Sequence, residues 1–426
     1  MSFQQGLSGL NASSKNLDVI GHNIANANTV GFKASRAEFA EMVASAIGSS
    51  GGVNAGIGVE VADVAQQFSQ GNLTITGNSL DVAINGNGFF TLQMPDGTPA
   101  YTRAGNFKLD KVGNMVTNDS ARVMGYPVDP TTGLRTGSTP VPMSFPTTEP
   151  IPARQTTTIT TSFNLDARAT DAAGDPTATP PVPATPRATY GTSINVYDSQ
   201  GVAKPVNLYF QKTATDNTWD VYDQLDDPLA TPPVVATPIG QITFDNSGAI
   251  TGPVATPPAT GFSMPLTVNP TPPNPNNLPA FDVQIDLGGV TQFGTKFAVS
   301  NLTQDGYTAG ELTGINVENN GMIMTRYSNG VTRAEGQLAL SSFRNTQGLA
   351  SLGGNNWAAT FESGQPVVGA PTDGSFGSLR SGALEDSNVD LTAELVNMMT
   401  AQRAYQANAQ TIKTQDQVMS TLVNLR

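Results

Sequence analysis

Few residues of this chain have types and spacings that could support chemistry. His22 is the only histidine and cysteine is absent, so a two-histidine zinc site, a disulfide and a cysteine nucleophile are all ruled out. A histidine-dependent triad would have to use a residue inside the first helical segment. We therefore interpret His22 as an ordinary polar helix residue. We predict that the chain is not an enzyme and that it has no cofactor and no metal site.

Three loop motifs resemble ligand sites only superficially. Asn85-Gly86-Asn87-Gly88 has the glycines of a phosphate loop, but no lysine follows at the required position and both flanks have strand patterns. A hairpin turn is the prediction there. Asp226-Asp227 precedes Pro228 and is interpreted as a solvated pair in a loop. Asp305-Gly306-Tyr307 lacks the repeated ligands of a calcium loop.

The strongest periodic patterns lie at the two ends of the chain. Between Ser387 and Arg426, apolar residues recur every three or four positions once the polar Gln402 and Asp416 are counted. This spacing predicts a long helix whose seam packs on another helix. Ser387, with Asp390 three positions later, predicts a capping box at its start.

A matching seam, made shallower by Ser14 and Gly21, predicts a second helix over residues 3–27. The alternative to an assembly seam is an ordinary bundle within one chain. The predicted seam residues are Phe3, Leu7, Leu10, Leu17, Ile24, Leu391, Leu395, Met398, Tyr405, Ala409, Ile412, Met419 and Val423.

Composition excludes several classes of partner. The 426 residues carry a net charge of −13, and only 13% of them are charged. No basic stripe could neutralise phosphates, so no nucleic acid partner is expected. No run approaches the length of a transmembrane span, so no direct membrane insertion is expected. The first residues lack a basic leader and a continuous apolar core, so we expect no cleaved signal peptide.

Between the ends, the pattern favours strands and turns. Phe32 to Ile47 has a short helical pattern that gives way to a glycine-rich connector over residues 48–58. From Val59 the apolar period becomes two, which is typical of half-buried strands. Asn320-Gly321 and Asn329-Gly330 supply further turns. The strands predicted outside the proline-rich block lie at residues 59–61, 73–75, 80–84, 89–92, 312–317 and 337–343.

Proline divides the chain. Most of its 30 prolines lie between Pro140 and Pro279, in segments that separate strand patterns at residues 156–164, 193–197, 206–210 and 281–287. Proline marks connections and excludes central strands. The predicted fold is therefore mainly β with long α-helical termini: two nested all-β domains plus a two-helix, coiled-coil-like terminal region. The predicted parts are terminal helices at 1–27 and 387–426, connectors at 28–70 and 371–386, a discontinuous first β domain at 71–145 and 305–370, and an inserted outer β domain at 146–304.

These residues carry a resemblance to the bacterial flagellar rod and hook proteins. Leu17 to Asn26, LDVIGHNIAN, followed by Thr29 and Gly31-Phe32-Lys33, resembles their N-terminal signature. Ser387 to Leu391, SNVDL, then ELV from Glu394 and QRAYQANA from Gln402, resembles the C-terminal one. Thr303 to Tyr307, TQDGY, with Ala309-Gly310, resembles the stretch where hook proteins re-enter the first β domain. His22 stands where the family more often has asparagine or serine. The signature residues we single out are Asn23, Asn26, Gly31, Phe32, Gln402, Arg403 and Asn408.

The resemblance implies a structural subunit of the flagellar hook, the flexible joint that links the basal-body rod to the filament and transmits torque. It implies helical self-assembly with the terminal helices innermost, and an extracellular location in the flagellum reached through the flagellar type III export apparatus. The implied partners are the chain itself, the rod, the hook cap and the hook-filament junction proteins. A distal rod protein would share both signatures, but the large insert favours the hook. A secreted carbohydrate-active β-protein is the alternative from a different class, and it would need paired carboxylates in a cleft.

Overall fold

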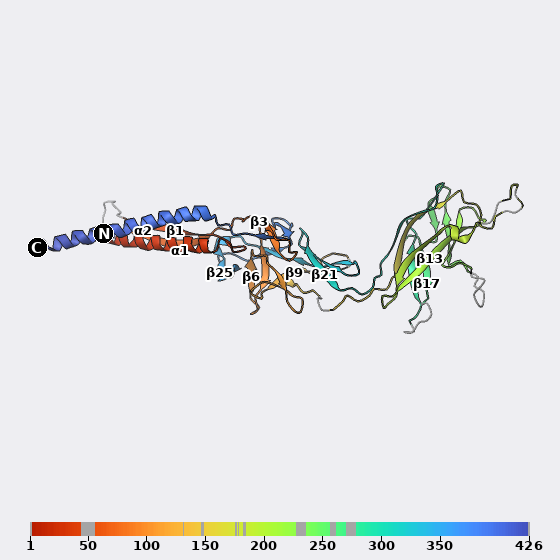
Figure 1. Cartoon of the computed structure of the whole chain (residues 1–426), viewed down its shortest axis with the longest axis horizontal. Helices are drawn as coiled ribbons and strands as arrows, with labels where there is room; N and C mark the ends of the chain where they lie inside the picture. The colour runs from red at the N-terminus through yellow and green to blue at the C-terminus, as the bar shows by residue number, and fades with distance from the viewer. Residues whose placement is uncertain are drawn as a thin grey trace. The chain divides into compact units, whose positions relative to one another are not determined.

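The computed structural model describes residues 2–43, 56–130, 132–145, 149–174, 177, 179–181, 185–226, 236–255, 261–269 and 278–424. Within these residues the chain is mainly β with one α-helix near each end, which confirms the predicted fold class (Figure 1). The chain forms two compact units. Unit 1 comprises residues 1–148, 312–326 and 332–426, and unit 2 comprises residues 149–311 and 327–331. Residues 305–311, which the sequence placed with the first β domain, thus belong to unit 2.

The two helices are α1 (Ser2–Ala25) and α2 (Leu391–Asn424). The predicted capping box at Ser387 is wrong, because Asp390 itself is the cap: its Oδ1 accepts hydrogen bonds from the backbone N–H of Thr392 at 2.9 Å and of Ala393 at 3.2 Å. The side chain at this position satisfies amides that have no partner within the helix. Ser387 stays outside the helix, where its hydroxyl accepts from Val389 N–H.

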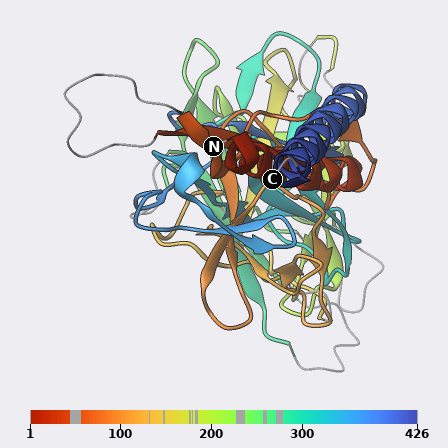
Figure 2. The ribbon, with the colours of Figure 1, turned by 90° about the vertical axis from the view of Figure 1, so that its left-hand side faces the viewer.

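The helices lie side by side and run antiparallel (Figures 1 and 2). Gly6 faces Ile412 and Gly9 faces Asn408, so closely that a Cβ on Gly9 would lie 3.0 Å from the Asn408 side chain. At the other end of the pair, the Asn23 amide donates to Glu394 Oε1 at 3.4 Å. Small residues on α1 thus allow the two backbones to approach closely.

An antiparallel hairpin of β1 (Ser35–Val43) and β2 (Gly56–Gln66) packs against α1. The short helix predicted over Phe32 to Ile47 is therefore wrong. Pairing with β2 along the whole length of β1 overrides the helical preference of its Ala, Glu and Met residues. Most of the glycine-rich stretch, residues 44–55, lies outside the described residues.

The β part of unit 1 contains a 13-stranded sheet and two small strand pairs, β4–β28 and β3–β29. The pairs use β3 (Leu73–Ile75), β4 (Val82–Asn85), β28 (Ser378–Ser381) and β29 (Ala383–Glu385). The segments predicted as connectors, residues 28–70 and 371–386, therefore contain β1, β2, β28 and β29.

The hairpin predicted at Asn85-Gly86 is wrong, because β4 pairs with β28 and not with the strand that follows it. The strands of the large sheet are β5 (Phe89–Gln93), β6 (Pro99–Thr102), β7 (Lys108–Leu109), β8 (Met115–Val116), β9 (Arg122–Pro127), β10 (Val141–Pro142), β21 (Leu312–Val317), β22 (Met322–Tyr327), β23 (Thr332–Leu338), β24 (Leu340–Ser342), β25 (Ala350–Gly353), β26 (Asn356–Ala358) and β27 (Val367–Gly369). The single strand predicted over Gln337 to Phe343 is divided between β23 and β24. A short 3₁₀ helix, Thr346–Gly348, follows β24.

Unit 2 consists of two five-stranded sheets with alternating burial along their strands. Side chains from both sheets, among them Phe163, Phe210, Trp219 and Ile285, form one apolar core, as in a β-sandwich. One sheet has β11 (Thr158–Asp166), β17 (Ser263–Val268), β18 (Phe281–Asp286), β19 (Thr291–Phe293) and β20 (Ala298–Gln304). The other has β12 (Gly191–Tyr197), β13 (Ala203–Lys212), β14 (Thr218–Tyr222), β15 (Gly240–Phe244) and β16 (Ile250–Gly252). The four strands predicted in the proline-rich block correspond to β11, β12, β13 and β18, which confirms them.

Candidate functional site

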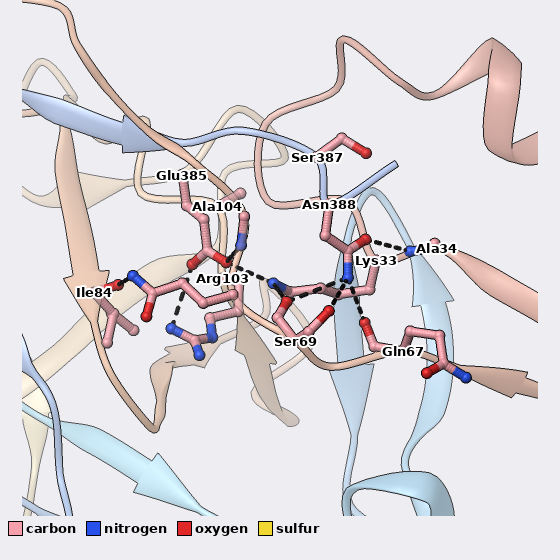
Figure 3. Close-up of polar contacts among 12 residues, drawn as sticks. Lys33, Ala34, Gln67, Ser69, Ile84, Arg103, Ala104, Glu385, Ser387 and Asn388 are labelled. Carbon is pink, nitrogen blue, oxygen red and sulfur yellow. Dashed lines mark hydrogen bonds and ion pairs between the residues drawn. The ribbon is translucent and has the colours of Figure 1, made fainter. Parts of the chain in front are cut away.

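The two ends of the chain meet at a buried polar junction, which joins the helices to the β part of unit 1 (Figure 3). The segment after α1 contributes Lys33, the segment before α2 contributes Glu385 and Asn388, and Arg103 comes directly after β6. Lys33 and Glu385 are 352 positions apart in the sequence. The junction thus consists of long-range contacts that no local sequence pattern predicts.

Glu385 is the centre of this junction and is completely buried. Its Oε1 accepts a hydrogen bond from Lys33 Nζ at 2.5 Å and another from Gly71 N–H at 3.0 Å. Its Oε2 lies 3.3 Å from Arg103 Nη1. Lys33 Nζ also donates to Ser69 O, and Arg103 Nη2 donates to Gly86 O. One carboxylate therefore holds two buried cations and three segments of chain.

The electrostatics of the junction are unusual because all three charged side chains are buried. Burial lowers the pKa of Lys33, while the charge and hydrogen bond of Glu385 oppose that change. Burial likewise lowers the pKa of Arg103, again opposed by Glu385. Glu385 is the counter-ion of both cations, so its loss would leave two desolvated charges unpaired.

Asn388 ties together three backbone segments around this ion cluster. Its Oδ1 accepts from Ala34 N–H at 2.7 Å, and its Nδ2 donates to Gln67 O at 2.7 Å and to Ser69 Oγ at 2.9 Å. These bonds fix the chain just before α2 to the chain just after α1. The direction in which α2 leaves the β part is set here.

The N-terminal signature residues shape the exit from α1. Asn23 is buried, and its side chain bonds both the N–H and the C=O of Ser35, which positions the start of β1. Asn26 donates to His22 O at the helix end. Gly31 has a φ of +68°, and a Cβ there would lie 2.6 Å from Ala104 N, so only glycine fits. Phe32 is buried with its ring 5.5 Å from that of His22.

Only part of the apolar stripe predicted on α2 is covered by α1. Met398, Ala409 and Ile412 are half-buried, whereas Leu391, Leu395, Tyr405 and Met419 are exposed. Exposed Val396 and Met399 broaden the uncovered part of the stripe. Gln402 and Arg403 are exposed too, while Asn408 lies against α1 and donates to Ser13 Oγ. The side chain of Val423 lies outside the described residues.

On α1, the predicted apolar seam does not form the face that α2 covers. The contact uses Gly6, Gly9 and Ser13, which the apolar spacing did not single out. Leu10, Leu17 and Ile24 are half-buried and Leu7 is exposed. The side chain of Phe3 lies outside the described residues. Both helices thus keep apolar surface that their own partner leaves uncovered.

The loop motifs have structural roles in the part of the chain that is described. Asp305 accepts hydrogen bonds from the backbone N–H of Thr157 and Thr158 and pairs with Arg154, which ties the two ends of unit 2 together. Asp226 accepts from Ala236 N–H and from Arg187. The described residues hold no group of three or more His, Asp or Glu placed to bind a metal ion. Neither α1 nor α2, the helices among these residues, is apolar enough over its length to cross a membrane.

Comparison with known proteins places these features in a family. Over 439 residues, covering all of both chains, the sequence is 42% identical to the flagellar hook protein FlgE of Salmonella typhimurium. It is 42% identical over 431 residues, again covering both chains fully, to that of Escherichia coli. This chain belongs to the flagellar hook protein family. Its role is that of a structural subunit of the hook.

Family models divide this hook protein much as its units do. Residues 3–33 match the flagella basal body rod protein, and residues 380–425 match the flagellar basal body rod FlgEFG protein C-terminal region. Residues 83–166 match the flagellar hook protein FlgE/F/G D1 domain, and residues 164–307 match the flagellar basal body protein FlaE D2 domain. The crystal structure of Helicobacter pylori flagellar hook protein FlgE2 covers 73% of this chain with a TM-score of 0.52 at 15% identity, which shows a shared fold.

Sequence reasoning missed the buried ion cluster of this hook protein. Arg103 and Glu385 were not candidates, and Lys33 and Asn388 appeared only inside quoted signature runs. The one available signal was that two charged residues, Lys33 and Glu385, flank the two helical segments. A pair separated by 352 positions has no spacing rule that would have identified it.

Proposed function

We propose that this hook subunit polymerises head to tail into a helical tube through the apolar faces of its terminal helices. The observation that carries the proposal is the exposed stripe of α2 formed by Leu391, Leu395, Val396 and Met399. These side chains lie beyond the α1 contact, and contiguous apolar surface of this kind is typical of a protein interface. A contact between different patches of identical subunits that does not close produces a helical polymer.

The junction supports the mechanical part of this function. A joint that transmits torque has to pass force between its inner helices and its outer β units without unfolding. Glu385, Lys33 and Arg103 connect the helices to the β part of unit 1 through a buried ion cluster with bonds to several backbone segments. We place the flexibility at the surfaces between neighbouring subunits and the rigidity at this junction.

The remaining parts of the proposal concern partners and location. The subunit contacts further copies of itself, the rod at one end of the hook, and the hook cap and hook-filament junction proteins at the other. It reaches the outside of the cell through the flagellar type III export apparatus without cleavage of a signal peptide. It has no catalytic activity. The full-length resemblance to hook proteins favours this role over that of a distal rod protein.

Electron microscopy of the purified full-length chain tests the proposal. At high protein concentration and in precipitating salt, which strengthens apolar contacts, we expect tubes with helical symmetry whose innermost density is helical. The helical circular dichroism signal should rise or stay constant on assembly. A chain that stays monomeric under all such conditions, or that forms only amorphous aggregates, would contradict the assignment.

A further inference from the structure

Glu394, in the first turn of α2, has a shielded carboxylate oxygen for which the described residues supply no donor. Its Oε2 is buried without a hydrogen-bond partner, and its Oε1 accepts a hydrogen bond of 3.4 Å from the Asn23 amide. A buried acceptor that stays unbonded carries a desolvation penalty, which is larger for a charged group than for a neutral one. Glu394 is therefore suited to receive a donor from outside the chain.

Glu394 lines a groove of about 490 Å³ between α1, β1 and α2. Its polar lining includes Asn16, Asn23, Asn397 and Thr400, whose side-chain oxygens can accept further hydrogen bonds. The Glu394 side chain is partly exposed, and the last torsion of a glutamate rotates over a broad range, so Oε2 can turn toward a group that enters the groove. A cation with several N–H donors fits this chemistry.

The rest of the groove suits the stem of such a cation. Its apolar lining is mostly small and includes Ala37, Ala401 and Ala404. Methylene groups of a long basic side chain pack well on surface of this kind. Among the described lining residues Arg36 is the one cation, and its Nη2 already lies 2.6 Å from Glu38 Oε1.

Arg403 is an exposed cation on α2, and no described residue forms an ion pair or hydrogen bond with it. It lies four positions after Met399 and seven after Val396, so it continues the exposed apolar stripe along the same side of the helix. A neighbouring copy that covers this stripe therefore also encloses the Arg403 guanidinium. An enclosed cation needs a carboxylate beside it.

Glu394 and Arg403 cannot pair within one chain. They are nine positions apart on α2, which places them on opposite sides of the helix and roughly 14 Å apart along its axis. The groove and the stripe are thus different patches of the same subunit. A contact between the groove of one copy and the stripe of the next joins subunits head to tail.

The other carboxylates near the helices have partners or water. Asp390 caps α2, and Asp18 and Glu38 lie beside cations of their own segments. Four more are exposed to solvent: Glu41, Glu60, Asp63 and Asp416. Among the described residues of the helices and the β1–β2 hairpin, the shielded oxygen without a partner belongs to Glu394.

We propose that Arg403 of one subunit enters this groove of a neighbouring subunit and donates hydrogen bonds to Glu394. The inference rests on the proposed self-assembly and deepens it. Apolar contact is not directional, so a stripe alone would allow neighbouring helices to slide along each other. An arginine–carboxylate pair has a defined geometry and fixes the register of the two subunits.

Charge reversal in the full-length chain tests the pair. Arg403→Glu and Glu394→Arg should each raise the protein concentration needed for assembly by about ten-fold or more, because like charges then meet in the contact. The chain with both substitutions should assemble within about three-fold of the unaltered concentration, since the exchanged charges pair again. Lys111→Glu, which makes the same charge change on the exposed β7–β8 turn, should alter it by less than about two-fold.

A cycle of neutral variants gives a second measurement that keeps the side-chain shapes. Arg403→Gln should weaken assembly in the unaltered chain and have little further effect in Glu394→Gln, because the two residues act as one pair. Thermal unfolding of each monomer shows that it is folded, and if Glu394→Arg is not, the neutral cycle decides.

Three results would overturn the inference. They are normal assembly of Arg403→Glu, failure of the folded double reversal to recover assembly, and independent, additive effects of the two glutamine substitutions. Failure of the unaltered chain to assemble would instead overturn the proposed function.

Discussion

Replacing Leu395 by aspartate should separate assembly from folding. In the described structure the Leu395 side chain is 45% exposed and lies on the side of α2 that α1 does not cover. The monomer therefore has room for a solvated carboxylate at this position. We expect the thermal stability of the monomer to be nearly unchanged, because surface substitutions alter it by only about 0.5 kcal/mol.

The magnitude of the assembly defect follows from the area that a neighbour would cover. Burying the exposed half of a leucine is worth about 1 kcal/mol, since full burial is worth about 1.5–3 kcal/mol. Enclosing an unpaired carboxylate in the same contact costs about 3 kcal/mol or more. The sum, about 4 kcal/mol per contact, corresponds to roughly a thousand-fold weaker association.

The assay is sedimentation of assembled tubes at a series of protein concentrations. Thr411→Asp is the matched control: it lies 16 positions further along the same helix and is exposed, and at 3.6 residues per turn it points about 160° away from Leu395. We expect Leu395→Asp to stay in the supernatant and Thr411→Asp to sediment like the unaltered chain. Equal sedimentation of both variants would refute the assignment of the exposed stripe to a subunit contact.

Three further predictions concern the junction and unit 2. Glu385→Ala should lower the free energy of unfolding by about 3–5 kcal/mol in denaturant titrations, because two buried cations lose their counter-ion. As a control, Arg36→Ala removes an exposed ion pair and should change the free energy of unfolding by at most about 1 kcal/mol. Burial alone would raise the pKa of Asp305, but hydrogen bonds from Thr157 and Thr158 outweigh this effect and the pKa is lowered. The stabilisation by the ionised carboxylate is present above about pH 4 and is lost as the pH falls through the lowered pKa. The melting temperature of unit 2 should therefore fall more steeply with acid in the unaltered chain than in Asp305→Asn. Replacing residues 149–311 by a short Gly-Ser linker should leave tubes that electron microscopy detects but whose curvature differs, and a folded variant unable to form any tube would contradict this division of roles.

The parts of the fold that the sequence predicted are those with local periodicity. The two helices and the alternating strands of unit 2 depend on patterns within ten to thirty residues, and the structure contains them. The strand β1 was missed because pairing with β2, the next strand along the chain, overrides the helical preference of its residues. The turn at Asn85-Gly86 was misassigned because glycine and asparagine indicate a turn but not which strands pair across it.

The candidate site was harder to predict because its contacts join segments that are far apart in the sequence. Apolar spacing identified a stripe on α2, but only the structure shows that Met398 and Ile412 are half-buried while Leu391 and Leu395 are exposed. The close contact of Gly6 and Gly9 with α2 left no apolar signal. The buried cluster around Glu385 joins segments from opposite ends of the chain, and a single sequence contains no rule that links them.

The sequence separation within the junction also sets an order of events in time. Lys33 and Glu385 lie 352 positions apart, and closing so long a loop carries an entropic penalty that shorter contacts avoid. The paired strands of unit 2 are closer than this in sequence, and β12, for example, pairs with β13, the next strand along the chain. Unit 2 can therefore form its strand pairs before the junction closes. We therefore expect the junction to close last during folding, and until it closes the chain lacks the bonds that fix the direction of α2.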